Sequence, residues 1–336
     1  MKLKSAVPAV LVAASLLLAG CASGADTAGS GSAERIEFQA KDPVTIGYSV
    51  FDLTEPYFQA YAAGVKAGAA QEGIEVLIAD SKSSPQLQVS GSADLINQGI
   101  SALVVSPIQP SALPATISAA HQAKIPVVVG DVGVEGDYDA YILSDNADGG
   151  RQAADYFRSA FKDRSGEQKI GVIGLAPGVV VGEERIDSFE AALDGDPNFD
   201  VVSKLTGQTV DGAFKAAQDM LNANPDLAGI YAVNSNNVQG AVRAIKSAGR
   251  EGQVKVVGFN GDPVELPMIA GGEESATVAQ DPYGQGKLAV KTALELLNGQ
   301  NPAYTDPATR TLRFPVEIVD ADNLDAYREK LTSEQQ

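Results

Sequence analysis

Beyond residue 43, short apolar runs alternate with longer stretches in which apolar residues recur every three to four positions. The first run is 44–50, and a helical pattern with Phe58 and Tyr61 on one stripe follows at about 55–72. Further strand-like runs lie at 75–79, 102–105, 126–130, 141–143, 170–174, 201–205, 229–233, 254–259, 276–279 and 312–319. Further helical patterns lie at 86–98, 111–123, 147–161, 183–193, 212–222, 238–248 and 284–297. Nearly continuous apolar strands between helices predict α/β architecture, with parallel sheets covered on both faces.

The same alternation occurs in both halves of the chain, which predicts two doubly wound lobes. One continuous core rarely grows to the size of this chain, so two lobes are also the default expectation from its length. In open parallel sheets, ligands bind beyond the carboxyl ends of the strands. The cleft between the lobes is therefore expected to be lined by residues that directly follow strands.

Polar and aromatic side chains gather at these strand ends. The positions that follow strands are Phe51, Asp52, Pro107, Asp131, Asn234, Asn260 and Gln280, with Tyr57 and Phe58 nearby. Hydrogen-bonding side chains recur among them and no basic cluster appears. The expected cleft lining therefore combines hydrogen-bonding side chains with aromatic rings.

The N-terminus predicts export. A short basic start at 1–4 precedes an apolar stretch too short to span a membrane, which indicates a signal peptide over residues 1–20. The segment closes on Leu-Ala-Gly-Cys, which resembles the bacterial lipobox, and Cys21 would then be lipidated after cleavage. The alternative is an ordinary signal cut that leaves Cys21 as a free thiol. Residues 21–42, small, polar and rich in glycine, are expected to form a flexible tether, which places the protein outside the cytoplasm on the cell membrane.

Composition excludes several classes. Cys21 is the only cysteine, so an intrachain disulfide and a cysteine-based metal site are both impossible. The formal net charge of −18 repels nucleic acid, so no nucleic-acid partner is expected.

In order and spacing, several short motifs resemble the periplasmic sugar-binding family typified by ribose-binding proteins, with the type I solute-binding fold. They are Thr45-Ile46-Gly47-Tyr48, Pro56-Tyr57-Phe58, Ile125 to Asp131, Ser144-Asp145-Asn146, Glu184-Arg185 before Phe189, Val257 to Gly261, and Ala279-Gln280. The resemblance covers about residues 43–333. It implies two lobes, 43–146 plus 281–307 and 147–280 plus 308–333, joined by a hinge of three crossings near Asn146, Gln280 and Pro307.

The resemblance also implies roles for individual residues. Tyr57 and Phe58 would stack on the apolar face of a sugar, and Asp131 would accept hydrogen bonds from its hydroxyls. Asn234 and Gln280 would donate and accept, and Asn260 stands where the family usually has aspartate. The alternative for Tyr57 and Phe58 is helix core. For Asn234 and Asn260 it is a turn or cap role.

The chain departs from the family pattern at four positions. Val132 stands where an arginine usually follows the aspartate, and Glu183 stands at a second arginine position. Glu55 replaces a common asparagine, and Phe51 replaces a small polar residue. Because arginine forks grip ring oxygens and paired hydroxyls, these losses favour a polyol, a modified sugar or a ligand with a cationic group held by aromatic faces, Asp131 and Glu183.

No catalytic site is predicted. His121 is the only histidine and falls on a helix expected to pack outside a sheet, so a His-based triad or metal site is not expected. Adjacent acidic pairs such as Glu183-Glu184 point in different directions on a helix. No metal and no cofactor are expected.

Together these observations predict a monomeric solute-binding lipoprotein that delivers a small polar ligand to the permease subunits of an ABC importer. Two alternatives remain open. A sensory receptor would present the same ligand to a membrane kinase or chemoreceptor, and an extracellular enzyme would need a nucleophile–base pair that the cleft lacks.

Overall fold

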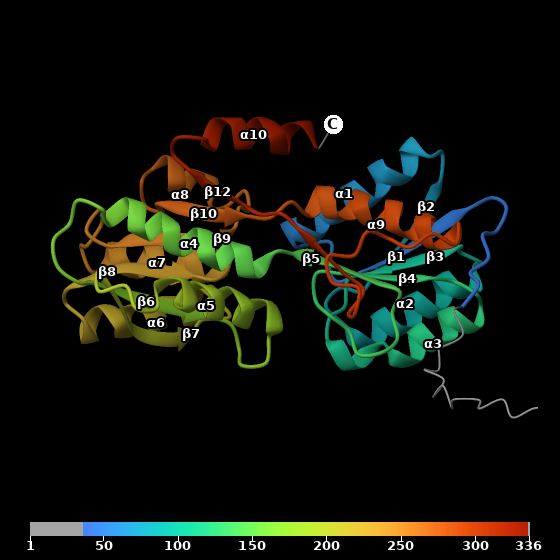
Figure 1. Cartoon of the computed structure of the whole chain (residues 1–336), viewed down its shortest axis with the longest axis horizontal. Helices are drawn as coiled ribbons and strands as arrows, with labels where there is room; N and C mark the ends of the chain where they lie inside the picture. Colours follow the sequence, from blue (N-terminus) through green and yellow to red (C-terminus); the bar gives the residue numbers. More distant parts are fainter. Residues whose placement is uncertain (1–35, 335–336) are drawn as a thin grey trace, which may run out of the picture. The chain divides into compact units, whose positions relative to one another are not determined.

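The protein, described by a computed structural model over residues 36–334, has two six-stranded sheets, each covered on both faces by helices (Figure 1). The strands are β1 (Thr45–Val50), β2 (Glu75–Asp80), β3 (Ala102–Val105), β4 (Val127–Gly130), β5 (Ala140–Ser144), β6 (Gln168–Gly174), β7 (Phe199–Thr206), β8 (Leu227–Ala232), β9 (Lys255–Asn260), β10 (Ala276–Ala279), β11 (Thr311–Phe314) and β12 (Glu317–Asp320). The helices are α1 (Pro56–Gln71), α2 (Pro85–Asn97), α3 (Pro114–Gln122), α4 (Asn146–Phe161), α5 (Val180–Leu193), α6 (Val210–Ala223), α7 (Ser235–Ser247), α8 (Leu266–Ala270), α9 (Pro282–Leu297) and α10 (Leu324–Ser333), with a 3₁₀ turn at Pro110–Ala112. The predicted α/β fold of two doubly wound lobes is confirmed.

The first lobe is a fully parallel sheet in the order β11-β5-β4-β3-β1-β2. Helices α1 and α9 pack together on one face, where Tyr48, Tyr61 and Val65 are buried in one apolar cluster. On the other face, α2 and α3 cover a second cluster that contains Leu103 and Val129. The strand order reverses between β1 and β3, so the carboxyl ends of these strands border a crevice.

The second lobe repeats the order as β12-β10-β9-β8-β6-β7, and only the β10–β12 pair is antiparallel. One face carries α4 and α5 over Phe157, Phe189, Tyr231 and Phe259. The other carries α6 and α7. Neither α8 nor α10 was predicted; both pack beside β12 and bury Tyr327.

The chain passes between the two sheets at Asp145, at Gln280 and at Pro315. The predicted third crossing near Pro307 is corrected, because β11 pairs with β5 and so residues 308–314 belong to the first lobe. The single strand predicted over 312–319 is two strands in different sheets. Proline lacks the N–H that a ladder needs, and Pro315 separates them.

The predicted tether also differs from the structure at its C-terminal end. Within the described residues 36–42, the Gln39 N–H donates to the Lys124 carbonyl at 3.1 Å, and the Lys41 N–H donates to Ser101 Oγ at 3.1 Å. Phe38 lies 6.0 Å from the His121 ring. These residues therefore pack on the first lobe. The signal segment 1–20 and Cys21 lie outside the described residues.

Candidate functional site

A cavity of about 330 Å³ lies at the carboxyl ends of the strands; we call it the ligand cleft. Eight of the nine predicted ligand residues line it: Phe51, Glu55, Tyr57, Phe58, Asp131, Asn234, Asn260 and Gln280. It is also lined by Val132, Leu175, Val179, Val181, Arg185, Ser235, Asn236 and Asp262. Residues that follow strands as distant in sequence as β1 and β10 therefore line one cavity, as expected for the carboxyl ends of parallel strands.

One wall of the ligand cleft is aromatic. The Phe51 and Phe58 rings stack with centroids 4.9 Å apart and an interplanar angle of 8°, and Tyr57 meets Phe58 edge-on at 5.1 Å. Pro56 occupies the first turn of α1, where its fixed φ favours the helix start. Phe58 is only 7% exposed, so it belongs to the core as well as to the cleft wall. The two predicted roles of Tyr57 and Phe58, helix core and ligand contact, are therefore compatible with each other.

Asp131 follows β4 with a φ of 68°, an unusual conformation for a non-glycine residue. Its N–H donates to the Ile142 carbonyl at 2.9 Å, and its carbonyl accepts from the Tyr141 hydroxyl at 2.8 Å, so its backbone is fixed. Burial raises the pKa of its carboxyl to about 6, although the Arg185 guanidinium and the Tyr57 hydroxyl both act in the opposite direction. The side chain is therefore a partly buried hydrogen-bond acceptor in the wall of the ligand cleft.

Arg185 on α5 is the one basic residue among those that line the ligand cleft, and it is 4% exposed. Its Nε donates to Asn146 Oδ1 and its Nη1 to the Val233 carbonyl, both at 2.8 Å. Its guanidinium carbon lies 3.7 Å from the Phe259 ring centroid. Held on three sides, this cation forms a fixed part of the cleft, and its field favours the ionised form of Asp131.

A continuous chain of hydrogen bonds links the two lobes through the hinge; we call it the hinge relay. The Tyr57 hydroxyl donates to Gln285 Oε1 at 3.1 Å, and Gln285 Nε2 donates to Ser144 Oγ at 3.0 Å. Ser144 Oγ donates to Gln280 Oε1 at 2.6 Å, and Gln280 Nε2 donates to Asn260 Oδ1 at 2.8 Å. Gln285 is fully buried and Ser144 and Gln280 nearly so, so the two central bonds form away from bulk water, whereas the bonds to Tyr57 and Asn260 are partly buried.

On the second lobe the relay continues into the loop after β9. Asn260 Nδ2 donates to Ser235 Oγ at 3.0 Å and to Asp262 Oδ2 at 3.1 Å. Asn260 has a φ of 126°, again in the left-handed region. Asn234 caps α7, where its Oδ1 accepts from the Asn237 N–H at 2.9 Å. The amide oxygen of Asn234 therefore has the cap role that was the predicted alternative.

The family model described as a periplasmic binding protein domain matches residues 46–301. The chain belongs to the periplasmic binding protein family. A ribose import binding protein of Bacillus subtilis is 31% identical over 90% of this chain and 96% of its own. A xylitol-binding protein of Mycolicibacterium smegmatis is 25% identical over all of this chain and 91% of its own. A solute-binding protein of Actinobacillus succinogenes, solved with bound D-allose, has a TM-score of 0.74 at 25% identity and covers 84% of this chain and all of that one.

These relatives confirm the resemblance and bear on the class of protein. They are binding and import proteins and not enzymes, as the sequence predicted. Family membership also implies that this periplasmic binding protein works outside the cytoplasm. Among residues 36–334, no helix is long and apolar enough to cross a membrane.

Glu183, the ninth predicted ligand residue, does not line the ligand cleft. Its Oε1 accepts from the Gly178 N–H at 2.7 Å and closes the loop before α5. Val181 and Arg185 lie four residues apart and so share the helix face that meets the cleft, whereas Glu183 lies between them in sequence. Of the two positions at which the family pattern has arginine, the first places Val132 in the cleft lining, and the second, Glu183, lies outside it. Near the second position, Val179 and Val181 line the cleft.

Sequence reasoning omitted Arg185, Ser235 and Asp262 from the site. Arg185 belongs to a motif that carried the resemblance, so its signal was present in the sequence. Ser235 and Asp262 each lie one or two residues beyond a strand-end asparagine. Extending the strand-end rule by two residues would have found both.

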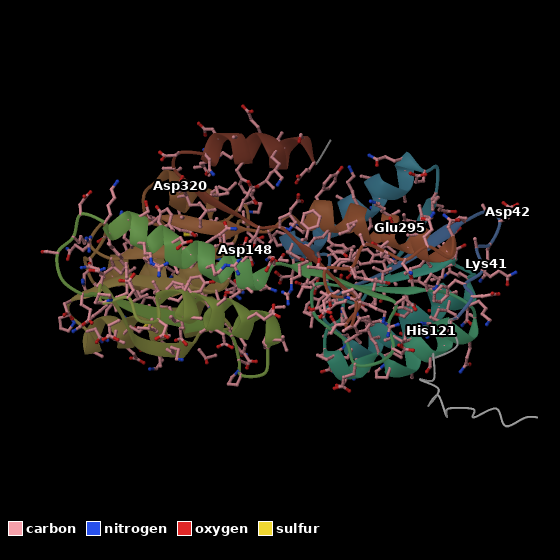
Figure 2. All side chains as sticks on the ribbon, viewed as in Figure 1. Lys41, Asp42, His121, Asp148, Glu295 and Asp320 are labelled. Carbon is pink, nitrogen blue, oxygen red and sulfur yellow. The ribbon has the colours of Figure 1, made fainter. Side chains whose placement is uncertain are left out.

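His121 lies on α3 (Figure 2). It lines neither the ligand cleft nor the second cavity described below. Its Nε2 lies 2.9 Å from Asp139 Oδ2, which also accepts from the Val127 N–H at 2.7 Å. The histidine therefore ties α3 to the loop before β5. Within residues 36–334, no group of three or more His, Cys, Asp or Glu side chains is placed to hold a metal ion.

Two buried carboxyl groups lie behind the Asp262 loop. Glu265 Oε2 accepts from the Gly261 N–H at 2.7 Å and from Thr277 Oγ1 at 2.9 Å. Burial, with the neighbouring Asp262 carboxylate, raises the pKa of Glu265, and burial next to Glu265 raises the pKa of Glu274. A Cβ on Gly258 would lie 2.3 Å from Glu274 Oε1, so the glycine makes room for this carboxyl.

Proposed function

We propose that this protein is the solute-binding component of an ABC importer and captures a polyol or a modified sugar in the ligand cleft. The observation that carries the proposal is one aromatic wall, Phe51, Tyr57 and Phe58, facing fixed polar groups supplied by both lobes. Carbon-bound hydrogens of a polyol pack on such rings, and its hydroxyls pair with the carboxylate and amides. The relatives named above, which bind ribose and xylitol, support this ligand class.

The apolar part of the cleft lining narrows the class of ligand that fits. Val132, Val179 and Val181 line the ligand cleft near the positions where the family pattern has arginines. A buried ring oxygen or hydroxyl opposite valine would lose its partner, which costs about 1–3 kcal/mol. A ligand with fewer oxygens on that side, such as a deoxy sugar or a short polyol, avoids this cost.

The proposal is tested by calorimetric titration with D-ribose, D-allose, xylitol and myo-inositol at pH 7.5. At least one should bind, and Asp131→Ala and Asn234→Ala should each weaken that binding by about 1–3 kcal/mol, because each leaves ligand hydroxyls without a partner. Equal affinity of the wild type and both variants would remove these residues from the site. Tight binding of ribose in preference to all others would contradict the narrowed class.

Closure of the lobes on the ligand is part of the proposal. The equilibrium between hinge states shifts by the difference in ligand affinity between them. The ligand-bound monomer would then dock on permease subunits. A pull-down of the permease with the ligand-loaded protein supports this assignment, and capture of a membrane kinase or chemoreceptor instead would support the receptor alternative.

Anchoring through Cys21 is proposed from the sequence alone. The Leu-Ala-Gly-Cys segment supports a lipid on the thiol and a new N-terminus at this residue. Expression of the full chain and of Cys21→Ser, followed by fractionation, tests it. Wild type in the membrane fraction and the variant released or unprocessed would agree with the anchor; identical fractionation would contradict it.

A further inference from the structure

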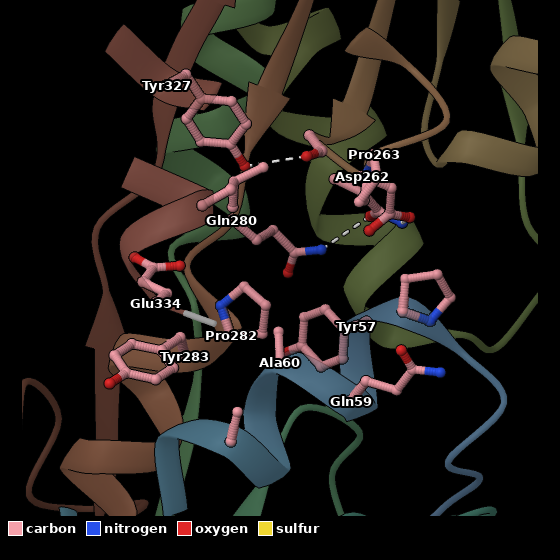
Figure 3. Close-up of a pocket in the computed structure, with 15 residues that line it drawn as sticks. Tyr57, Gln59, Ala60, Asp262, Pro263, Gln280, Pro282, Tyr283, Tyr327 and Glu334 are labelled. Carbon is pink, nitrogen blue, oxygen red and sulfur yellow. Dashed lines mark hydrogen bonds between the residues drawn. The ribbon is translucent and has the colours of Figure 1, made fainter. Parts of the chain in front are cut away.

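A second cavity, of about 270 Å³, adjoins the ligand cleft on the side of α10; we call it the rear chamber (Figure 3). It is lined by the first turns of α1, the loop after β9, the start of α9 and the last turns of α10. The two cavities share five lining residues, Pro56, Tyr57, Asn260, Asp262 and Gln280. These five shared residues therefore form the partition between the ligand cleft and the rear chamber.

The charged groups that line the rear chamber are both acidic, Asp262 and Glu334. Asp262 Oδ2 accepts from Asn260 and Ser235, whereas no hydrogen bond reaches its Oδ1 from the described residues. The Glu334 carboxyl is half-buried and has neither a hydrogen bond nor an ion pair within residues 36–334. Burial and the nearby Asp281 raise its pKa, whereas the charges of Lys330 and Lys287 lower it.

Neighbouring lysines do not fully neutralise the negative charge of Asp262 and Glu334. Lys330 Nζ lies 3.4 Å from Asp281 Oδ2 and 3.1 Å from Glu317 Oε1, so its ammonium is shared between two other carboxylates. Lys287 lies over the Tyr283 ring, 5.8 Å from the centroid. Neither lysine lines the chamber. Among residues 36–334, two carboxyl groups and no basic side chain therefore line the chamber.

Three tyrosines complete the lining, Tyr57, Tyr283 and Tyr327, and Figure 3 shows their rings around the same space as Glu334 and Asp262. Two of the hydroxyls are bonded elsewhere: Tyr327 to the Gly261 carbonyl at 3.0 Å and Tyr57 to Gln285. These bonds hold both rings in place. Fixed aromatic rings beside carboxylates are the arrangement that binds organic ammonium groups in proteins.

We propose that the rear chamber binds an ammonium group carried by the ligand of the cleft, so that the preferred ligand is an amino-substituted polyol or sugar. The inference rests on the proposed function. It moves the cation site from Glu183, which turns away from the cleft, to Glu334 and Asp262. A neutral hydroxyl in the same place would gain neither the ion pair nor the ring contact.

Matched pairs of ligands test the proposal by calorimetry on the full chain at pH 7.5. The pairs are xylitol and 1-amino-1-deoxyxylitol, D-glucitol and 1-amino-1-deoxy-D-glucitol, and D-glucose and D-glucosamine. In at least one pair the amine should bind about tenfold more tightly than its hydroxyl partner. This preference should fall at least threefold in Glu334→Gln and in Tyr283→Leu. It should be unchanged in the control Glu329→Gln, an exposed carboxyl on the same helix that lines neither cavity.

The outcomes separate the two proposals. If neutral members bind and no amine binds more tightly, the rear chamber has no cation preference and this inference is wrong while the proposed function stands. A preference that survives both substitutions would place the ammonium elsewhere and overturns the inference too. If no sugar, polyol or amine binds at all, the proposed function itself fails.

Discussion

Arg313 on β11 and Glu184 on α5 form a bidentate ion pair between the two lobes, with Nη1–Oε2 and Nη2–Oε1 distances of 3.1 Å. Both side chains are less than one third exposed. Because β11 belongs to the first sheet and α5 covers the second, the pair favours the lobe arrangement in which it forms.

Arg313→Gln should broaden the distribution of distances between the lobes, because a partly exposed pair contributes up to about 1 kcal/mol. Spin labels on α2 at Ser90 and on α6 at Gln218 report this distance by electron resonance. The matched control is Arg310→Gln, whose arginine pairs with Asp137 inside the first lobe. Identical distributions for the wild type and Arg313→Gln would show that the pair does not bias the hinge.

The hinge relay predicts coupling between residues in α1 and α9. Gln285→Met keeps the side-chain size but removes the acceptor for Tyr57 and the donor to Ser144. Tyr57→Phe removes only the hydroxyl. Each variant should lower ligand affinity. Because either change breaks the same Tyr57–Gln285 bond, the loss of binding free energy in the double variant should be smaller than the sum of the two single losses by about 0.5–3 kcal/mol.

Calorimetry of the four proteins with one ligand completes this double-mutant cycle, and melting temperatures establish that all four are folded. Strict additivity would mean that the relay does not transmit between the aromatic wall and the hinge.

The raised pKa of Asp131, about 6, predicts a pH dependence of binding. The ionised carboxyl accepts hydrogen bonds from ligand hydroxyls and the protonated one does so less well, so affinity should rise with pH through about 6 and level off above 7. We expect a loss of up to about tenfold between pH 7 and pH 5. Titrations across this range should show the step in the wild type and not in Asp131→Asn; a step that persists in the variant would belong to another group.

Glu265 and Glu274 predict a pH dependence of stability. Their pKa values are raised in the folded state, so the native protein keeps protons that the unfolded chain releases. The free energy of unfolding contributed by these groups should therefore fall as pH rises above the ordinary glutamate pKa of about 4.3, until the raised values are passed.

Glu274→Gln resembles the protonated acid and should remove part of the decrease in the free energy of unfolding as pH rises. The difference in melting temperature between variant and wild type should grow from pH 5 to pH 8. Glu273→Gln, in which the replaced carboxyl is on the surface and pairs with Lys246, is the control. A difference that stays constant with pH would mean that Glu274 is not protonated in the native state.

Sequence reasoning succeeded where a side chain's place depends on the sheet alone. Asp131, Asn234, Asn260 and Gln280 each follow a parallel strand, and the carboxyl ends of such strands meet at one edge whatever the details of packing. It did not foresee that Glu183 lies outside the cleft lining, because the orientation of α5 about its axis depends on how its buried face, with Arg185 and Phe189, packs on the second lobe.

The position of the third crossing was mispredicted for a different reason. Residues 312–319 read as one strand because apolar and polar residues alternate through them, and Pro315 was the available signal that the ladder breaks. Which sheet each half joins depends on pairing partners far away in sequence, β5 for one and β10 for the other. A single sequence does not contain that choice in any local pattern.

The position of β11 at the edge of the first sheet sets the order in which the chain can complete its fold. Helix α9 covers Tyr61 and Val65, and β11 closes the sheet beside β5, yet both emerge after nearly all of the second lobe. In a chain that emerges from its N-terminus, the first lobe thus remains unfinished, with an apolar face of α1 and one strand edge uncovered, until residue 314 is available. Completion of the first lobe therefore depends on residues that follow almost the whole of the second lobe in sequence.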